Sequence, residues 1–133
     1  MMTDWNAYRA HLGQSVQAFA TLAPDTLKGL QTLDHAAAAT GHLDAKTREL
    51  IALAVAVTTR CDGCIAVHSK AAVKAGATKE EIAEALGVAV ALNAGAALVY
   101  SSRVLDAVDT VTAEPGGDAC DGVNPVLVSP RFT

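Results

Sequence analysis

Aromatic residues are scarce in this chain, whose 133 residues include one Trp, two Tyr and two Phe. A core built on large rings is therefore excluded, and Ala, Val, Leu and Ile must supply the packing. Small side chains let helices approach closely, but each of them buries little area. The stretch 88–99 also has almost no polar face. Both features predict that the helices of one chain pack against further copies in an oligomer.

Basic residues are also few, and their distribution excludes one class of ligand. The ten Lys and Arg residues are scattered, and the formal net charge is −4. Because nucleic-acid binding requires a basic patch or stripe, we expect no nucleic acid as the main ligand. The hydrophobic share of 51% and the charged share of 18% are typical of a folded chain and not of a disordered one.

We expect neither a secretory signal nor a membrane-spanning segment in this sequence. The segment 1–6 lacks the basic start and apolar run of a secretory signal. The longest weakly polar run, 88–100, is shorter than the ~20 residues that cross a bilayer. We therefore expect a cytoplasmic protein that is not associated with a membrane.

Helical periodicity dominates the chain, and the fold class that we predict is all-α, with about six helices in a single domain. Capping residues such as Asp4 and Asp44, the Pro24–Asp25 start and the Thr78-x-x-Glu81 capping box mark the beginnings of helices. Breaks are expected at Gly41, at 60–63, at Gly76 and near Asn93 and Gly95. The resulting helices cover about residues 5–19, 24–40, 45–59, 64–76 and 79–93, and a sixth runs from there to about 108.

From residue 109 onward, Gly and Pro become frequent, and we expect an irregular tail. The apolar triplet Val126, Leu127 and Val128 either docks on a neighbouring subunit or belongs to a mobile end. Cys120 also lies in this tail, and we interpret it as an incidental thiol.

The remaining two cysteines form a close pair, Cys61-x-x-Cys64, followed by His68. In a reducing cytosol such a pair is catalytic, redox-sensing or metal-binding more often than it is structural. Residues three and four apart lie on one face of a helix, so this segment presents two thiols and a base together. At the start of a helix, unpaired backbone N–H groups and the helix dipole stabilise a thiolate.

The spacing favours Cys64 as the attacking sulfur, because His68 lies one turn beyond it and Cys61 lies two turns from the imidazole. Glu49 is on the preceding helix, which we expect to run antiparallel. Its carboxylate can orient or charge the imidazole, as a carboxylate does for a catalytic histidine.

These residues resemble those of the carboxymuconolactone decarboxylase superfamily, and within it the alkyl hydroperoxidase D-like branch. The matching pattern is E-x11-C-x2-C-x3-H, formed by Glu49, Cys61, Cys64 and His68. The surrounding sequence that also matches is the segment 47–56 around Glu49 and the stretch 68–82 that begins at His68. The resemblance covers about residues 30–108, so the chain divides into an N-terminal helical segment, 1–29, this helical domain, 30–108, and the tail, 109–133.

The resemblance implies an all-helical fold, homotrimers or homohexamers, and reduction of hydroperoxides through a reversible disulfide, without a cofactor. Cys64 corresponds to the thiol that attacks the peroxide and Cys61 to the resolving thiol, while His68 and Glu49 correspond to the proton relay. The substrate would be a hydroperoxide or a small disulfide. A lipoamide-type dithiol or a thioredoxin-like protein would reopen the disulfide.

Two alternatives remain open. The four side chains offer S, S, N and O ligands that suit zinc, although a second ligand pair is missing from the sequence. The chain also has Gly63 where peroxidases of the branch carry a second histidine inside the cysteine pair. This difference favours a non-enzymatic, redox-sensing oligomer as the competing function.

Overall fold

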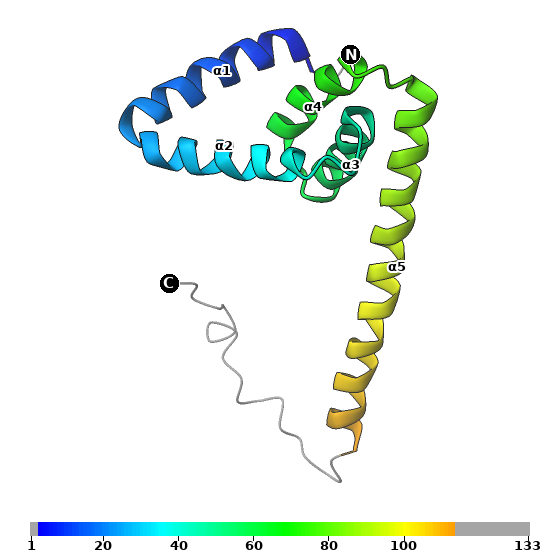
Figure 1. Ribbon diagram of the computed structural model, residues 1–133. Helices are drawn as coiled ribbons and strands as arrows, with labels where there is room; N and C mark the ends of the chain where they lie inside the picture. Colours follow the sequence, from blue (N-terminus) through cyan, green and yellow to red (C-terminus); the bar gives the residue numbers. More distant parts are fainter. Residues whose placement is uncertain (1–2, 114–133) are drawn as a thin grey trace. The chain divides into compact units, whose positions relative to one another are not determined.

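The computed structural model describes residues 3–113, and the described chain is helical with no strand (Figure 1). Five helices follow one another in that range: α1 (Trp5–Leu22), α2 (Pro24–Ala39), α3 (Ala45–Thr58), α4 (Asp62–Lys74) and α5 (Lys79–Thr112). The expected all-α class is confirmed. The predictions for Cys120 and for the triplet 126–128 lie outside the described residues.

The predicted capping residues begin the helices as expected. Asp4 Oδ1 accepts hydrogen bonds from the backbone N–H groups of Asn6 and Ala7 at 3.1 and 3.0 Å. Asp44 accepts one from Thr47 N–H at 2.7 Å, and Pro24 occupies the first turn of α2. Each acceptor satisfies donors that have no partner inside the helix, so these local sequences are sufficient to place the starts of α1 and α3.

The capping box at the start of α5 is also confirmed. Glu81 N–H donates to Thr78 Oγ1 at 3.1 Å, and Thr78 N–H donates to Glu81 Oε2 at 2.8 Å. The two residues thus satisfy each other's free backbone donors. Just before it, Gly76 adopts a φ of +86°, a left-handed conformation that ends α4 and that glycine reaches without steric cost.

The predicted break near Asn93 and Gly95 is wrong, because one continuous helix, α5, replaces the expected fifth and sixth helices and ends at Thr112. Asn93 Nδ2 donates to Ala89 O at 2.7 Å and to Thr58 Oγ1 at 3.0 Å, so its side chain is satisfied within helical geometry. A glycine inside a helix costs only about 1 kcal/mol relative to alanine. The high helix propensity of the neighbouring Ala and Leu residues therefore keeps α5 continuous at both positions.

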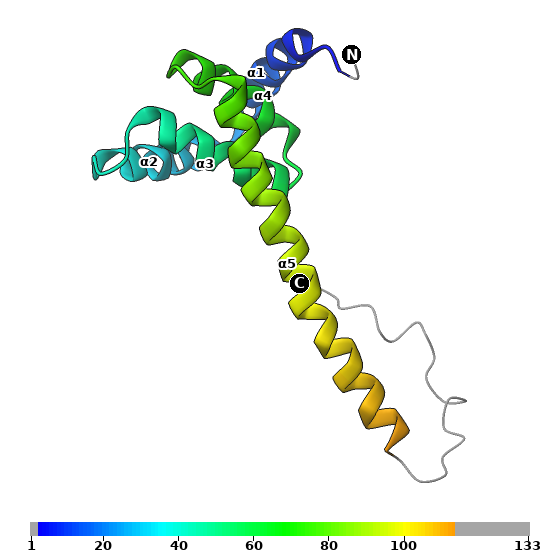
Figure 2. The ribbon, with the colours of Figure 1, turned by 90° about the vertical axis from the view of Figure 1, so that its right-hand side faces the viewer.

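The described residues divide into two compact units between Ala94 and Gly95. Within the first unit, α3 packs against α4, while α1 packs against both α2 and α4 (Figures 1 and 2). The predicted division at residues 29/30 and 108/109 stays a prediction. The pair α3 and α4 carries all four predicted site residues, and α1 covers another part of α4.

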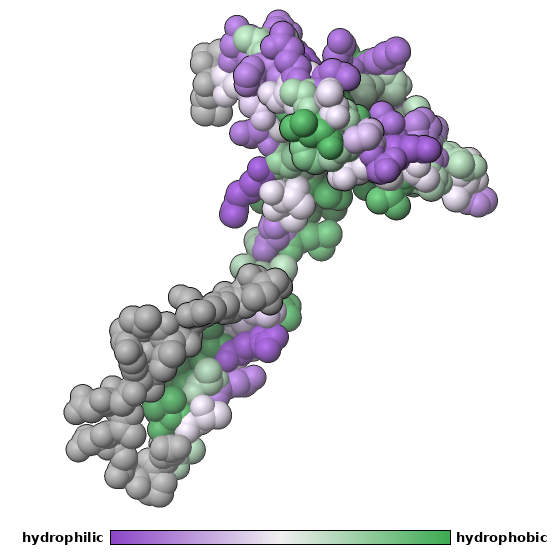
Figure 3. Space-filling view, turned by 90° about the vertical axis from the view of Figure 1, so that its left-hand side faces the viewer, coloured by the Kyte–Doolittle hydropathy of each residue, from purple (hydrophilic) through white to green (hydrophobic). Residues whose placement is uncertain are grey.

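Few side chains of the described residues are buried. The hydrophobic core consists of Leu53, Ala56, Ala66, Ala72 and Ala89, each at most 5% exposed. Hydrophobic side chains instead reach the surface, and Figure 3 shows them along α5. Leu98 is 76% exposed and Leu105 is 66% exposed. This amount of uncovered apolar surface is more than a stable monomer usually presents to water.

Helix α5 is long and apolar enough to cross a membrane by length and composition, with a mean hydropathy of 1.8 over 18 residues. The apolar run in the sequence is shorter than a bilayer span, but the continuous helix extends it. The same two properties are found in helices that pack between protein subunits, so they do not by themselves indicate a membrane.

Candidate functional site

The turn between α3 and α4 fixes the backbone of the first cysteine. Arg60 adopts a φ of +54°, and its N–H donates to Val57 O at 3.3 Å. Cys61 N–H reaches back to Ala56 O at 3.0 Å. This pattern is a Schellman motif, in which a left-handed residue closes the end of a helix. Cys61 is therefore held against the last turn of α3 before α4 begins.

Cys61 is also the N-terminal capping residue of α4. Its Sγ accepts a hydrogen bond from the backbone N–H of Cys64 at 3.1 Å. The helix begins at Asp62, two residues earlier than the sequence pattern predicted. Asp or Ser usually occupies this position, and a sulfur that accepts the same N–H is placed at the positive end of the helix dipole.

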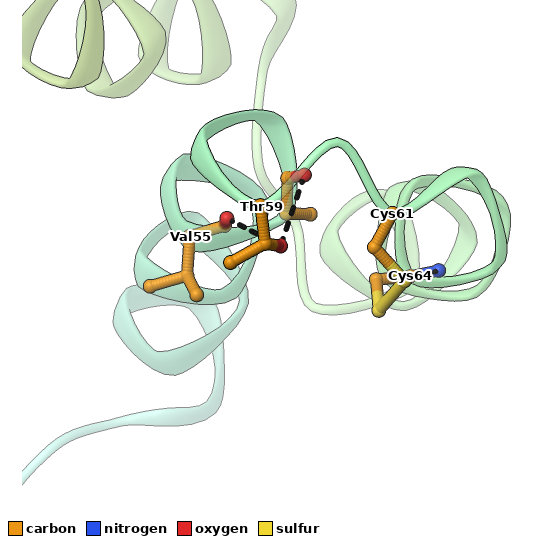
Figure 4. Close-up of a disulfide and its surroundings, with 5 residues drawn as sticks. Val55, Thr59, Cys61 and Cys64 are labelled. Carbon is orange, nitrogen blue, oxygen red and sulfur yellow. Dashed lines mark hydrogen bonds between the residues drawn. A yellow bond between two sulfur atoms is a disulfide. The ribbon is translucent and has the colours of Figure 1, made fainter. Parts of the chain in front are cut away.

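The two cysteines are joined in a disulfide, with their Cα atoms 5.2 Å apart. Figure 4 shows the bond beside the C-terminal turn of α3, where Thr59 Oγ1 donates to the carbonyl oxygens of Val55 and Ala56 at 3.0 and 3.4 Å. Both cysteines are half-buried. The pair can therefore exist in an oxidised form without unwinding the start of α4.

Glu49 and His68 meet across the helix pair. Glu49 Oε2 lies 2.8 Å from His68 Nδ1, and the two side chains are 24% and 31% exposed. An ionised carboxylate only accepts hydrogen bonds, so Nδ1 carries the proton in that state and Nε2 remains for a second partner. His68 is one helical turn beyond Cys64, so the structure gathers all four predicted side chains at the α3–α4 contact.

A pocket of about 440 Å³ opens beside this carboxylate and imidazole. Its walls come from α2, α3 and the segment that joins them, and include Ala37, Leu43, Arg48 and Ile51. Arg48 donates a hydrogen bond to the carbonyl of Leu43. The lining is mixed, because Asp34 and Arg48 join Glu49 and His68 among otherwise apolar side chains, and the pocket offers space for a small organic molecule next to His68.

The contact of α4 with α1 was not predicted. Arg9 Nη1 donates to Ala66 O at 3.2 Å, and Leu12 Cδ2 lies 3.4 Å from the place where a Cβ on Gly63 would stand. Residue 63 inside the cysteine pair therefore faces α1. The only sequence signal for this contact is the apolar periodicity of 5–19, which does not say which helix it covers.

The same four side chains are the candidate zinc ligands of the sequence. Among residues 3–113, no group of three or more His, Cys, Asp or Glu side chains has an arrangement that suits a metal ion. Glu49 is engaged by His68, and the two sulfurs are bonded to each other. Because thiolates and not disulfides bind zinc, this oxidised arrangement does not support a zinc centre.

Comparison with known proteins gives consistent matches. The model of the carboxymuconolactone decarboxylase family matches residues 24–107. An uncharacterized protein of Haemophilus influenzae is 54% identical over 107 residues, which cover 80% of this chain and 95% of that protein. An uncharacterized protein of Cupriavidus necator is 31% identical over 113 residues, which cover 85% of this chain and 100% of that protein.

Solved structures agree in fold. A carboxymuconolactone decarboxylase family protein from Legionella pneumophila superimposes with a TM-score of 0.63 and 38% identity, covering 80% of this chain and 95% of that one. A protein from Methanobacterium thermoautotrophicum gives a TM-score of 0.60 and 32% identity, and the match covers 65% of this chain and 97% of that one. The helical arrangement is thus shared with both proteins over most of their lengths.

Proposed function

Because the chain belongs to the carboxymuconolactone decarboxylase family, we propose that it is a thiol-dependent oxidoreductase that reduces hydroperoxides through the Cys61–Cys64 disulfide. One observation carries the proposal: the disulfide lies at the N-terminus of α4, and an imidazole paired with a carboxylate follows one turn later. A redox-active sulfur pair next to a proton relay is what reversible thiol oxidation requires.

In the oxidative half-reaction, His68 takes the proton of Cys64, and the Cys64 thiolate attacks the terminal oxygen of the hydroperoxide. The O–O bond breaks, Cys64 becomes a sulfenic acid, and the alkoxide that leaves takes the proton from His68. Glu49 stabilises the imidazolium that forms between these two proton transfers. The sulfur loses two electrons and the peroxide gains them.

Cys61 then attacks the sulfenic sulfur of Cys64, and hydroxide leaves as water after it takes a proton. In the disulfide that results, the two Cα atoms are 5.2 Å apart, a separation that the bond accommodates. A small disulfide could replace the peroxide as oxidant by thiol exchange. A dithiol of the lipoamide type or a thioredoxin-like protein restores the thiols, and we propose that this occurs in the cytoplasm.

Replacing the attacking thiol tests the proposal. The variant Cys64→Ser should lose dithiol-dependent consumption of cumene hydroperoxide, whereas Cys120→Ser, which removes the thiol outside the pair, should retain it. Peroxide consumption is followed with dihydrolipoamide as reductant. Undiminished activity in Cys64→Ser would refute the assignment.

A redox sensor without turnover is the second candidate, and the surroundings of Gly63 favour it. Peroxidases that the sequence resembles carry a histidine at this position, but here Leu12 of α1 lies 3.4 Å from the Cβ position. Stopped-flow measurement of peroxide-driven disulfide formation separates the two functions. A rate no faster than that of a free thiol supports the sensor, and a faster rate supports the peroxidase.

We also propose that the protein assembles as a homotrimer or homohexamer. In the described part of the chain the core holds only five side chains, most of them alanine, while large apolar residues of α5 such as Leu98 and Leu105 are exposed. Helices that are apolar nearly all round are buried in larger assemblies. Light scattering should give the mass of three or six chains, and a clean monomer at micromolar concentration would contradict this proposal.

A further inference from the structure

The two sulfurs of the pair have different surroundings. Cys61 Sγ accepts the N–H of Cys64 at 3.1 Å and is the cap of α4, and its own N–H is bound to Ala56 O at 3.0 Å. Cys64 lies inside the first turn of α4, and its backbone N–H is already used by Cys61. Among residues 3–113, a backbone donor is therefore directed at the sulfur of Cys61 and not at that of Cys64.

This difference matters for the step that reopens the disulfide. A thiolate that attacks one sulfur expels the other as a thiolate, and exchange is faster when the leaving sulfur is the more stable anion. A thiolate at Cys61 keeps the hydrogen bond from Cys64 N–H and the favourable end of the helix dipole. Cys61 is therefore the better leaving group of the two.

Building on the proposed function, we propose that the reducing dithiol attacks Cys64 Sγ and that Cys61 leaves as the capping thiolate. In this step one thiolate of the reductant bonds to Cys64 as the Cys61–Cys64 bond breaks. Cys64 then carries a mixed disulfide, and no proton has yet been taken up by the protein.

The second thiol of the reductant completes the reaction. It loses its proton to His68 and attacks the reductant's own sulfur in the mixed disulfide, so that Cys64 leaves and takes the proton from His68. The reductant ends as a disulfide and gives up two electrons, which reduce Cys61 and Cys64. One sulfur, Cys64, thus receives both the peroxide oxygen and the reductant, next to the same relay of His68 and Glu49.

The sulfur that is attacked can be identified with a monothiol, which forms the mixed disulfide but cannot resolve it by ring closure. We would oxidise the full-length Cys120→Ser protein, add glutathione, and quench with N-ethylmaleimide within milliseconds to seconds. Trypsin cleaves after Arg60 and Lys70, which places both cysteines in one peptide. Tandem mass spectrometry then shows which sulfur carries glutathione and which carries maleimide.

We expect glutathione on Cys64 and maleimide on Cys61, in an excess on the order of tenfold over the reverse pattern. Glutathione mainly on Cys61, equal amounts of both patterns, or no adduct would overturn the inference.

A second measurement compares the two single thiols by their absorbance at 240 nm during a pH titration. With Cys120 replaced by Ser in both proteins, the Cys64→Ser variant, which retains Cys61, should form its thiolate at a lower pH than the Cys61→Ser variant, which retains Cys64. The reverse order would contradict the proposed leaving group.

These results are independent of peroxide turnover. Glutathione on Cys64 in a protein that consumes no hydroperoxide would uphold the direction of disulfide opening while the proposed peroxidase function failed. Peroxide turnover together with glutathione on Cys61 would support the peroxidase function and overturn the proposed direction of disulfide opening.

Discussion

Glu49 Oε2 and His68 Nδ1 lie 2.8 Å apart and join α3 to α4 one turn beyond Cys64. This contact fixes the imidazole by its Nδ1 atom and leaves Nε2 for the sulfur or the substrate. A catalytic imidazole needs such an anchor, because its proton transfer depends on both tautomer and orientation. The consequences for rate, pH dependence and stability can each be measured.

The charge of Glu49 should matter more than its shape. Glu49→Gln keeps a hydrogen-bonding side chain but loses the charge that stabilises the imidazolium, so oxidation of Cys64 by peroxide should slow by about 10²-fold or more. Stopped-flow fluorescence of the single Trp or rapid quench with maleimide would report the rate. Glu80→Gln, which removes an exposed acid in the first turn of α5, serves as the control and should react like the unmodified protein.

Loss of the imidazole should change the pH dependence of the thiol. In His68→Gln, alkylation of Cys64 by iodoacetamide should be slow near neutral pH and recover in alkaline solution, where hydroxide removes the proton instead. The control is His11→Gln, which changes an exposed residue of α1. Identical pH profiles for His68→Gln and the control would mean that the imidazole does not act on the thiol.

Arg60 occupies a conformation that glycine prefers. Its φ of +54° costs an ordinary side chain about 1 kcal/mol, and a β-branched residue suffers more. Arg60→Val should therefore lower the free energy of unfolding, measured in urea, by at least about 1 kcal/mol, while Arg60→Gly should leave it unchanged or higher. Equal stability of both variants would show that the left-handed turn is not needed to position Cys61.

Two capping carboxylates predict how stability changes in acid. The Lys46 ammonium, 2.7 Å away, and the N–H of Thr78 hold the pKa of Glu81 below its ordinary 4.5, and the N–H of Thr47 lowers that of Asp44. A lowered pKa in the folded state gives stability that is present above the ordinary value and is lost as the pH falls through the folded value. Acid should therefore remove these contributions.

Thermal unfolding of the unmodified protein and of Glu81→Gln tests this expectation. The difference in Tm should be largest near neutral pH and should shrink well below pH 4.5, where Glu81 is protonated. Because the groups are exposed, added salt should reduce the difference. The pKa of Lys46 is raised by Glu81, so its contribution persists until the solution becomes strongly alkaline. A difference that grows in acid would contradict the assignment.

Local signals in the sequence were sufficient for most helix boundaries. Asp4, Asp44 and the Thr78–Glu81 capping box act on backbone groups within three residues, so their effect can be predicted without knowledge of the fold. The spacing of Glu49 and His68 likewise follows from two helices joined by a short turn. The family resemblance added the roles of these residues, which remain predictions.

The remaining features depend on residues that are distant in sequence. The amide of Asn93 is satisfied by Thr58, 35 residues earlier, and this partner cannot be predicted from helical propensity. The contacts of Arg9 with Ala66 and of Leu12 with the Gly63 position also depend on which helix α1 packs against. Local patterns say which face of a helix is apolar but not what covers it.

The rate of peroxide-driven disulfide formation tests the central claim most directly. Reduced protein is mixed with cumene hydroperoxide in a stopped-flow instrument, and the second-order rate constant is compared with that of a free thiol at the same pH. The account predicts a faster reaction in the unmodified protein that falls in Glu49→Gln and is absent in Cys64→Ser. A rate equal to that of a free thiol, unchanged in Glu49→Gln, would contradict it.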